Sequence, residues 1–350
     1  MIKTNHTVHF SAAQDMSIIP DESVQEIVTS PPYPMIEMWD GVFAKQNPHI
    51  TSQLIKAYPL NAFELMHREL DKVWKECFRV LSPGGLLCIN IGDATRTIDG
   101  VFRLYDNHSR IAAACLDLGL FALPGIVWRK QTNAPNKFMG SGMLPCGAYI
   151  TLEHEHILIF RKGSKRNYNT SEQKDIRKHS AYFWEERNIW FSDLWDLKGV
   201  KQSIRNSDSR DRSAAFPLEI PFRLINMYSQ QGDTILDPFY GLGTTTQAAI
   251  VSCRNSIGFE IDESLKKSIE SNLKSIGLNE YNAMLEARMK RHSDFVQKRC
   301  AEKGAFKHTN PILEMPVMTS QETSLSLYSL SDIQFSATNG LSLSVSYRPL

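Results

Sequence analysis

Short apolar runs alternate with amphipathic stretches along most of the chain. The runs are rich in Val, Ile, Leu and Phe and are bounded by turn residues, a pattern typical of strands buried on both faces of a sheet. They occupy residues 25–30, 85–91, 121–128, 156–161, 234–237 and 256–261. Helical spacing of apolar positions lies between several of them, at residues 62–81, 108–118 and 244–251. This alternation predicts an α/β protein with a doubly wound sheet.

The alternation is lost over residues 163–213, where charged and polar residues dominate. Residues 161–212 hold thirteen Lys or Arg against eight Asp or Glu, a difference of +5. The aromatic residues interleaved with them are Trp184, Trp190, Phe191 and Trp195. Such a composition fits a nucleic-acid-binding insert and, equally, a solvated surface around a small core. Beyond it, residues 281–303 predict one charged helix, and residues 323–331 and 341–347 alternate in the manner of an edge hairpin or a weakly ordered tail.

Composition narrows the class of protein. The 350 residues are 42% hydrophobic and 22% charged, with a net charge of +1, which indicates a large core and gives no whole-chain preference for a polyanion. No apolar run approaches the roughly 20 residues that cross a bilayer, and the first residues are polar, so we expect a cytoplasmic protein. The six cysteines lie far apart, which favours reduced thiols over a disulfide framework or a zinc site.

A glycine-containing loop follows one of the predicted strands. Asp237 ends that strand, and Phe239, Gly241, Gly243 and Thr244 lead through the loop into a predicted helix. Such a loop exposes backbone N–H groups and a helix N-terminus at the carboxyl end of the strand, where nucleotide-like ligands bind. The Gly-Lys-Ser/Thr of a Walker A motif and the third glycine of a dinucleotide fingerprint are missing.

An acid, Glu260, ends the next predicted strand, 23 positions beyond Asp237. A carboxylate at this place can accept both hydroxyl protons of a ribose. Either feature alone also fits an ordinary turn with an incidental surface acid. Together, the loop and the acid favour an adenosine-containing cofactor.

Ser30-Pro31-Pro32-Tyr33 stands at the carboxyl end of another predicted strand. Prolines fix φ at about −65° and lack an N–H group, so the carbonyl groups of Ser30 and Pro31 become stiff acceptors. This combination suits a planar substrate with an NH₂ group. The Ser30 hydroxyl and a proline carbonyl can accept its two protons, and Tyr33 can stack on its ring. A generic Pro-rich turn is the alternative.

With these motifs the chain resembles, over roughly residues 5–275, the DNA amino-methyltransferases that use S-adenosylmethionine. The Ser-Pro-Pro-Tyr block matches their catalytic motif, and Asp237-Pro-Phe-x-Gly-x-Gly matches their cofactor loop. A catalytic block that precedes the cofactor loop is similar to the permuted beta group of that family. With serine at position 30, the motif is similar to that of the enzymes that methylate N4 of cytosine.

The resemblance implies a permuted methyltransferase fold, mostly parallel with one antiparallel strand. It adds Asp15, Phe216 and Pro217 to the expected contacts of the cofactor. The implied parts are a catalytic part at residues 1–162, a target-recognition insert at 163–213, a cofactor-binding part of the same domain at 214–278, and a C-terminal helix and tail of open role at 279–350.

The implied reaction is methyl transfer to N4 of cytosine within a specific site of double-stranded DNA, beside a partner restriction endonuclease and without a metal ion. The target base would leave the duplex to reach the catalytic block. Six basic residues of the insert are expected to contact DNA: Lys165, Arg166, Arg177, Lys178, Lys201 and Arg205.

Several alternatives stay open at this point. N6 of adenine could be methylated with the same geometry, and RNA or protein-glutamine methyltransferases also carry Pro-Pro-Tyr, usually after Asn or Asp. A catalytically silent nucleic-acid-binding protein would have a damaged loop or block, and both are intact here. Pro145-Cys146 resembles the nucleophile of cytosine C5-methyltransferases, but it precedes the cofactor loop, so we interpret Cys146 as a buried or loop cysteine. His154 and His156 are interpreted as a polar strand start.

Overall fold

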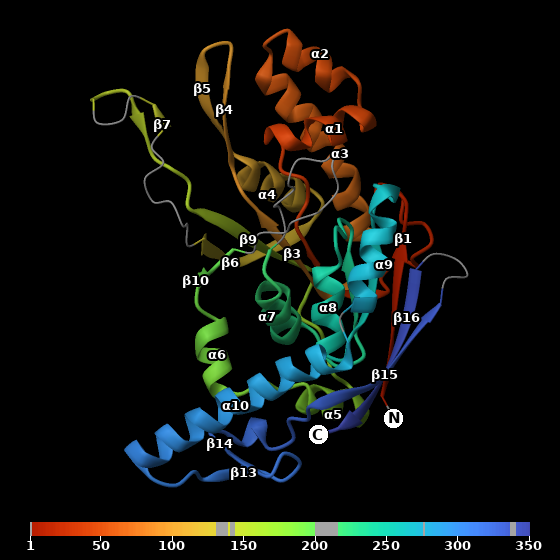
Figure 1. Cartoon of the computed structure of the whole chain (residues 1–350), viewed down its shortest axis with the longest axis vertical. Helices are drawn as coiled ribbons and strands as arrows, with labels where there is room; N and C mark the ends of the chain where they lie inside the picture. Colours follow the sequence, from red (N-terminus) through yellow and green to blue (C-terminus); the bar gives the residue numbers. More distant parts are fainter. Residues whose placement is uncertain (1, 131–138, 141–143, 200–215, 276, 337–340) are drawn as a thin grey trace.

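The computed structural model describes residues 2–130, 139–140, 144–199, 216–275, 277–336 and 341–350. A ten-stranded sheet runs through them (Figure 1). Its strands, in spatial order, are β10 (Leu194–Leu197), β6 (Leu120–Lys130), β9 (His154–Lys162), β3 (Leu81–Ile91), β2 (Val24–Thr29), β11 (Thr234–Asp237), β12 (Asn255–Phe259), β1 (Lys3–His9), β16 (Leu341–Pro349) and β15 (Tyr328–Ser336). Each of the six strands predicted from apolar runs is present in this sheet.

Two strands of the sheet run against the others. β9 is antiparallel to β3 and β6, as the resemblance implied for one strand. β16 is antiparallel to β1 and β15, so the expectation of a single reversed strand is corrected to two. The second reversal arises because the C-terminal segment forms a hairpin, one of the two forms that its alternating pattern left open, and adds to the sheet beside β1.

Helices cover both faces of the sheet, which explains why the central strands are apolar without alternation. Side chains of adjacent residues point to opposite faces of a strand. Ile27 therefore joins the core under α3 (Pro59–Val80) and α4 (Asn107–Asp117), while Val28 joins the core under α7 (Glu219–Tyr228) and α8 (Thr244–Val251). The structure confirms the helices predicted at α3, α4 and α8, and hence the doubly wound α/β sheet.

The sequence pattern missed β1 because its side chains are polar. Thr4 and His6 are nonetheless fully buried, and each is hydrogen-bonded: the His6 ring contacts the Thr4 hydroxyl at 2.8 Å and the Ser256 hydroxyl at 2.8 Å. Burial lowers the pKa of His6 to about 3, so the ring is neutral in this position. Polar pairs of this kind give no periodic signal, although they are part of the core.

Residues 163–199, the described part of the predicted insert, pack against the main sheet. They comprise α5 (Ser171–His179), α6 (Trp184–Trp190) and β10, and β10 is an edge strand of the main sheet. Trp190 and Trp195 are buried beneath the α7 face. Trp190 and Trp195 thus belong to the protein core, whereas Trp184 and Phe191 are 37% and 45% exposed. The remainder of the predicted insert lies outside the described residues.

The C-terminal region is joined to this segment by a buried ion pair. Arg288 of α10 (Leu278–Lys303) donates to Glu186 of α6 at 2.6 and 2.7 Å, with less than a tenth of either side chain exposed. Phe183 stacks on His292 nearby, with ring centroids 3.8 Å apart. The part that had no role in the sequence interpretation therefore completes the fold. Its other elements are η3 (Ser320–Glu322) and a small sheet of β13 (His308–Asn310) and β14 (Met315–Val317).

Several elements lie beyond the carboxyl ends of the parallel strands, toward the top of Figure 1. They are η1 (Glu37–Trp39), α1 (Asp40–Gln46), α2 (His49–Ile55), the hairpin of β4 (Ala94–Ile98) and β5 (Val101–Tyr105), and the pair of β7 (Met139–Gly140) and β8 (Ala148–Tyr149). η2 (Glu263–Leu265) and α9 (Lys266–Ser275) follow β12. Within the described ranges, no helix is both long and apolar enough to cross a membrane.

Candidate active site

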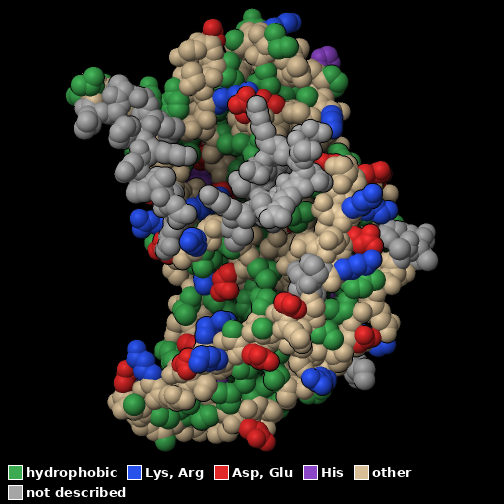
Figure 2. Space-filling view, viewed as in Figure 1, with side chains coloured by type: hydrophobic (Ala, Val, Ile, Leu, Met, Phe, Trp, Pro, Cys, Tyr) green, Lys and Arg blue, Asp and Glu red, His purple; other side chains and the backbone are tan. Residues whose placement is uncertain are grey.

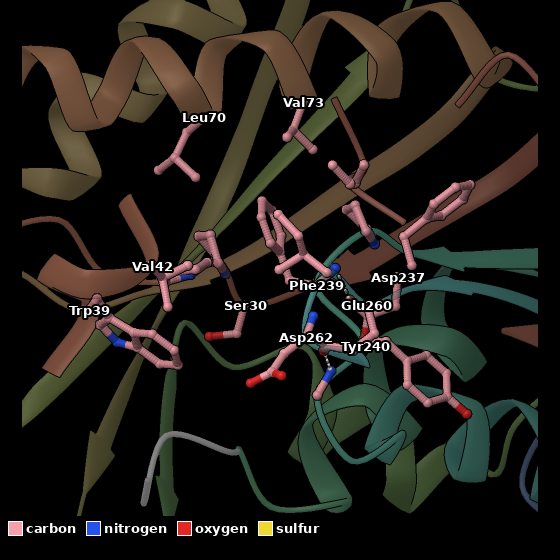
Figure 3. Close-up of a pocket in the computed structure, with 18 of the residues that line it drawn as sticks. Ser30, Trp39, Val42, Leu70, Val73, Asp237, Phe239, Tyr240, Glu260 and Asp262 are labelled. Atoms are coloured by element: carbon pink, nitrogen blue, oxygen red, sulfur yellow. Dashed lines mark hydrogen bonds between the residues drawn. The ribbon is translucent and has the colours of Figure 1, made fainter. Parts of the chain in front are cut away.

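A pocket opens where three adjacent parallel strands end. β2, β11 and β12 are neighbours, and their carboxyl ends lead to Ser30, Asp237 and Glu260 respectively. Figure 3 shows Leu70 and Val73 pointing into the pocket from a helix, with Trp39 and Val42 on another side. Of the predicted site residues, those that line the pocket are Ser30, Pro31, Pro32, Phe216, Asp237, Phe239, Gly241, Thr244 and Glu260.

Asp237 links the two halves of the site. Its carboxylate accepts the Thr29 hydroxyl proton at 2.7 Å, next to the catalytic block, and the backbone N–H of Phe239 at 3.1 Å. Burial raises the pKa of this carboxyl group, and the hydrogen bonds oppose that shift by stabilising the ionised form.

Glu260 is fixed by two backbone donors. The N–H of Gly241 donates to one carboxylate oxygen at 2.9 Å, and the N–H of Asp262 donates to the other at 2.8 Å. The residue is only 8% exposed, and burial raises the pKa of Glu260 to about 6. Each carboxylate oxygen keeps a second lone-pair direction, so Glu260 can still accept from a ligand in the pocket.

The cofactor loop is held by a close contact that sequence reasoning missed. Tyr240 is buried, and its backbone N–H donates to the carbonyl of Phe259 at 2.9 Å. Its ring lies over Gly258, where a Cβ atom would be 1.9 Å from Tyr240 Cδ2. Gly243, with a φ of +86°, is also close to this ring and precedes α8 directly. Only glycine leaves room for the ring at position 258.

Tyr33 is tied into a hydrogen-bond network behind the pocket wall. Its hydroxyl lies 3.1 Å from Ser30 Oγ and 2.9 Å from a carboxylate oxygen of Glu155. Burial and the negative charge of Glu155 raise the pKa of Tyr33 well above its ordinary value. Asn90 and Lys130 also contact Glu155. Glu155 and Asn90 were not anticipated from the sequence, because their neighbours in space are distant in the chain.

The rim of the pocket is anchored to the β4–β5 hairpin. Trp39, Val42 and Phe43 of η1 and α1 line the pocket. Next to them, Arg96 of β4 donates to both carboxylate oxygens of Asp40, at 2.9 and 2.7 Å. A bidentate pair of this kind fixes orientation as well as distance.

Three other predicted cofactor contacts do not line the pocket. Asp15 is exposed, and its carboxylate accepts the backbone N–H of Ser17 at 2.9 Å, whereas the preceding Gln14 does line the pocket. Pro217 is buried beside the pocket residue Phe216. Gly243 lies between the lining residues of the loop and α8, where it shapes the backbone.

Four of the six predicted DNA contacts lie away from the pocket. Arg166 forms a 2.6 Å ion pair with Asp233, which immediately precedes β11 and so lies at the opposite edge of the sheet from Asp237. Lys165 is adjacent to Arg166, and α5, which carries Arg177 and Lys178, lies toward the bottom of Figure 1. These four residues are therefore separated from the pocket by the length of the strands. Lys201 and Arg205 lie outside the described residues.

Basic and acidic side chains alternate over the visible described surface instead of forming one large basic patch (Figure 2).

The six cysteines are free; Cys77, Cys88, Cys115 and Cys253 are buried, while Cys146 and Cys300 are exposed. Cys146 is therefore a loop cysteine, which is one of the two forms expected for it.

Near the start of β9, the fold adds Asp93 and His108 to His156, and potential ligand atoms of these three side chains lie within 4.8 Å of one another. The two imidazole rings are stacked, with centroids 3.9 Å apart and planes inclined by 19°. Lone pairs in nearly parallel planes do not converge on a common point. His108 Nδ1 instead donates to a carboxylate oxygen of Asp93 at 2.8 Å.

Ser30, Asp237 and Glu260 thus share one pocket, and the chain is similar to known proteins over most of its length. Residues 24–271 match the model of the N6/N4 methyltransferase family, which is described as DNA methylase. The chain therefore belongs to the N6/N4 DNA methylase family.

Two archaeal relatives are similar over nearly their whole length. Type II methyltransferase M.MthZI of Methanothermobacter thermautotrophicus is 48% identical over 329 residues, covering 93% of this chain and 91% of the relative. Type II methyltransferase M.MjaI of Methanocaldococcus jannaschii is 49% identical over 293 residues, covering 79% and 95%.

Solved structures share the fold. TTHA0409 from Thermus thermophilus, in complex with S-adenosyl-L-methionine, has a TM-score of 0.58 and 30% identity, covering 76% of this chain and 94% of that one. The cytosine-N4-specific PvuII DNA methyltransferase has a TM-score of 0.52 and 18% identity, with coverage of 81% and 93%. These likenesses confirm the α/β methyltransferase fold.

The contact between Gly258 and Tyr240 makes a testable prediction. Gly258→Ala should lower the free energy of unfolding by about 1–3 kcal/mol, because the added methyl group forces the Tyr240 ring from its place. Urea denaturation measures this change. Gly41→Ala in α1 is the matched control: its Cβ would meet no atom within 4 Å, so stability should stay unchanged or rise by up to about 1 kcal/mol. Equal stability of Gly258→Ala and the wild type would contradict the proposed contact.

Proposed function

We propose that this protein transfers the methyl group of S-adenosylmethionine to N4 of cytosine within a specific site of double-stranded DNA. The observation that carries the proposal is the position of Ser30 and its prolines on the same pocket as Asp237 and Glu260. A rigid pair of acceptors for an amino group thus faces a site built for an adenosine-containing ligand. Membership of the N6/N4 DNA methylase family supports both parts of the reaction.

The residues of the pocket fit S-adenosylmethionine. Glu260 is the acceptor for the ribose hydroxyl groups, and Asp237 supplies negative charge for the ammonium group. A Cβ at Gly241 would meet no atom within 4 Å, so the loop leaves open space beside its backbone. The apolar lining residues Phe239 and Phe216 suit the adenine ring. When bound, this cofactor supplies an electrophilic methyl group on a sulfonium centre.

Ser30 and the proline carbonyl act on the nucleophile. The lone pair of an aromatic exocyclic amine is delocalised into the ring, so the amine is a weak nucleophile. Hydrogen bonds from its two protons to the Ser30 hydroxyl and the carbonyl of Pro31 favour a tetrahedral nitrogen and direct its lone pair out of the ring plane. This action needs no covalent bond between protein and base. The base must leave the duplex to reach the block.

Tyr33 has a different part in this proposal from the one its sequence suggested. Its hydroxyl is engaged by Glu155 and Ser30, and Tyr33 does not line the pocket, in contrast to Ser30, Pro31 and Pro32. We therefore assign stacking on the extruded base to Trp39, a partly buried residue that lines the pocket. Tyr33 supports the Ser30 hydroxyl instead.

Adenine N6 is the second candidate acceptor, because the same two acceptors suit any aromatic exocyclic amine. Serine at position 30 favours cytosine through the resemblance described above. The similarity to Type II methyltransferases supports a role in restriction–modification, beside a partner endonuclease that cleaves the unmethylated site. A cytoplasmic location follows from that role.

DNA is proposed to approach the carboxyl edge of the sheet, where the pocket opens. The β4–β5 hairpin and β8 project there, and Phe102 stacks on Tyr149 with ring centroids 4.3 Å apart. Arg103 lies opposite Arg96 in the hairpin. Arg96 is paired with Asp40, so Arg103 is the arginine of this pair that we expect to contact a phosphate group of DNA.

The identity of the methylated base is the first prediction here. DNA incubated with the protein and S-adenosylmethionine should contain N4-methylcytosine on nucleoside mass spectrometry. Ser30→Ala should lower the rate of methyl transfer by roughly 10²-fold, the scale of losing one preorganised polar contact. Detection of N6-methyladenine alone would reject cytosine and favour the second candidate.

Cofactor affinity should depend on pH through Glu260. The ionised carboxylate accepts the ribose hydroxyl protons, so affinity should be constant above a pH of about 6 and fall by up to about tenfold per pH unit below it. Calorimetry from about pH 8 to pH 5 measures this. Asp237 also faces the pocket, so Glu260→Gln assigns the effect: this variant should bind roughly 10- to 150-fold more weakly at the upper pH, without the same fall. A wild-type affinity that is flat over the whole range would contradict the role of Glu260.

The edge that binds DNA can be identified from salt dependence. Arg103→Ala should weaken DNA binding and reduce the slope of log affinity against log salt by about 0.9, the effect of losing one phosphate contact. Lys178→Ala is the matched control, since Lys178 is exposed on α5 and pairs with Asp175 at 2.8 Å. Fluorescence anisotropy at several salt concentrations compares them. A reduced slope for Lys178→Ala and not for Arg103→Ala would place DNA on the opposite edge.

A further inference from the structure

We infer that Glu155 is a positioning residue that fixes the direction of the hydrogen bond between Ser30 and Tyr33, so that Ser30 Oγ faces the substrate as an acceptor. The inference rests on the proposed function in one respect: the substrate must offer an N–H group to Ser30. It extends that function to a residue outside the motif and outside the pocket lining. It also assigns a purpose to a buried carboxylate that the methyl transfer itself does not use.

Glu155 is held as an acceptor. The residue is 7% exposed and lies at the start of β9, which places it beside the carboxyl ends of the parallel strands. Lys130, at the end of β6, forms an ion pair with one of its carboxylate oxygens. The other oxygen accepts from Tyr33 at 2.9 Å and from Asn90 at 2.6 Å. An ionised carboxylate has no proton to donate, so every bond it makes runs toward it.

The direction of the next bond follows from counting protons. The phenol group of Tyr33 has one proton, and it donates this proton in the hydrogen bond to Glu155. The amide nitrogen of Asn90 has two protons, and it donates to the Tyr33 oxygen at 2.9 Å as well as to Glu155. Turning this amide over would place its oxygen against the carboxylate, with no proton between two acceptors.

Ser30 is the last group in the chain of hydrogen bonds. Tyr33 has no proton left for Ser30, so in the 3.1 Å contact the Ser30 hydroxyl is the donor. Its own proton then points to Tyr33, away from the substrate, and the lone pairs of Oγ are free to accept an N–H proton. Without Glu155 the tyrosine could donate to Ser30, and the serine proton could point at the amine that it has to bind.

Packing keeps these groups in register. A Cβ at Gly92 would lie 3.0 Å from the Tyr33 ring and 3.2 Å from Cγ of Glu155, so the backbone closely adjoins both side chains. The pKa of Tyr33 lies well above its ordinary value, which keeps the phenol proton in place at neutral pH. A rotating phenol or carboxylate would lose the direction that the proton count defines.

Glu155→Gln tests the inference, since the amide has nearly the same shape but can donate as well as accept. The single-turnover rate of methyl transfer from tritium-labelled S-adenosylmethionine to unmodified DNA should fall by about tenfold, the loss expected when one hydrogen bond loses its direction. Cofactor affinity by calorimetry and the thermal unfolding temperature should change little. Glu153→Gln, two positions earlier in the chain, is the matched control and should retain the wild-type rate.

The decisive readout is the dependence on Ser30. In a Ser30→Ala background there is no hydroxyl group to orient, so adding Glu155→Gln should cause no further loss of rate. Tyr33→Phe, which keeps the ring and removes the phenol oxygen, should lose about tenfold alone and should likewise cancel the effect of Glu155→Gln. This second background serves if the activity of Ser30→Ala is too low to measure. If Glu155→Gln is poorly folded, Tyr33→Phe alone serves, and a wild-type rate for it would contradict the inference.

Two results would overturn the inference. One is a Glu155→Gln rate equal to that of the wild type. The other is a loss of the same size in the presence and absence of the Ser30 hydroxyl, which is what a general structural role for Glu155 would produce. Failure of the proposed function gives a different result, because then the wild-type protein itself transfers no label to DNA.

Discussion

The hydrogen bond between the Thr29 hydroxyl and Asp237 joins the two halves of the proposed active site, although 208 positions separate the residues. It exists because β2 and β11 are parallel neighbours that end at the same edge of the sheet. The catalytic block follows one strand, and the cofactor loop follows the other. The relative position of the acceptor block and the cofactor site therefore depends on the pairing of β2 with β11. It does not depend on the length of chain between the two strands.

Buried carboxylates recur at this edge, and each is satisfied in a different way. Asp237 receives a hydroxyl and a backbone N–H, Glu260 receives two backbone N–H groups, and Glu155 receives a lysine, a phenol and an amide. An unpaired buried charge is costly, so these donors stabilise the ionised forms. The donors also fix where the remaining lone pairs of each carboxylate point. In the proposed site, Glu260 thereby orients a ligand and Glu155 orients Tyr33.

The amino ends and the carboxyl ends of the parallel strands differ in what they carry. At the amino edge, Arg166 pairs with Asp233, and nearby the Arg288–Glu186 pair joins α10 to α6; both contacts hold the C-terminal half of the chain to the sheet. The carboxyl edge carries the pocket and the projecting hairpin. A count of charges along the chain could not distinguish Arg166, which is paired with Asp233, from a basic residue that binds DNA.

The sequence by itself determined the doubly wound sheet, the family, and that Ser30, Asp237 and Glu260 line one pocket, because buried parallel strands and the loops after them leave strong local patterns. Tertiary structure alone decided the placement of β1, whose polar residues pair in the core, and of Arg166, which pairs with Asp233. It also decided that Tyr33 turns toward Glu155, 122 positions away. These contacts join residues that are distant in the chain, and a hydrogen bond between such residues leaves no periodicity from which it could be predicted.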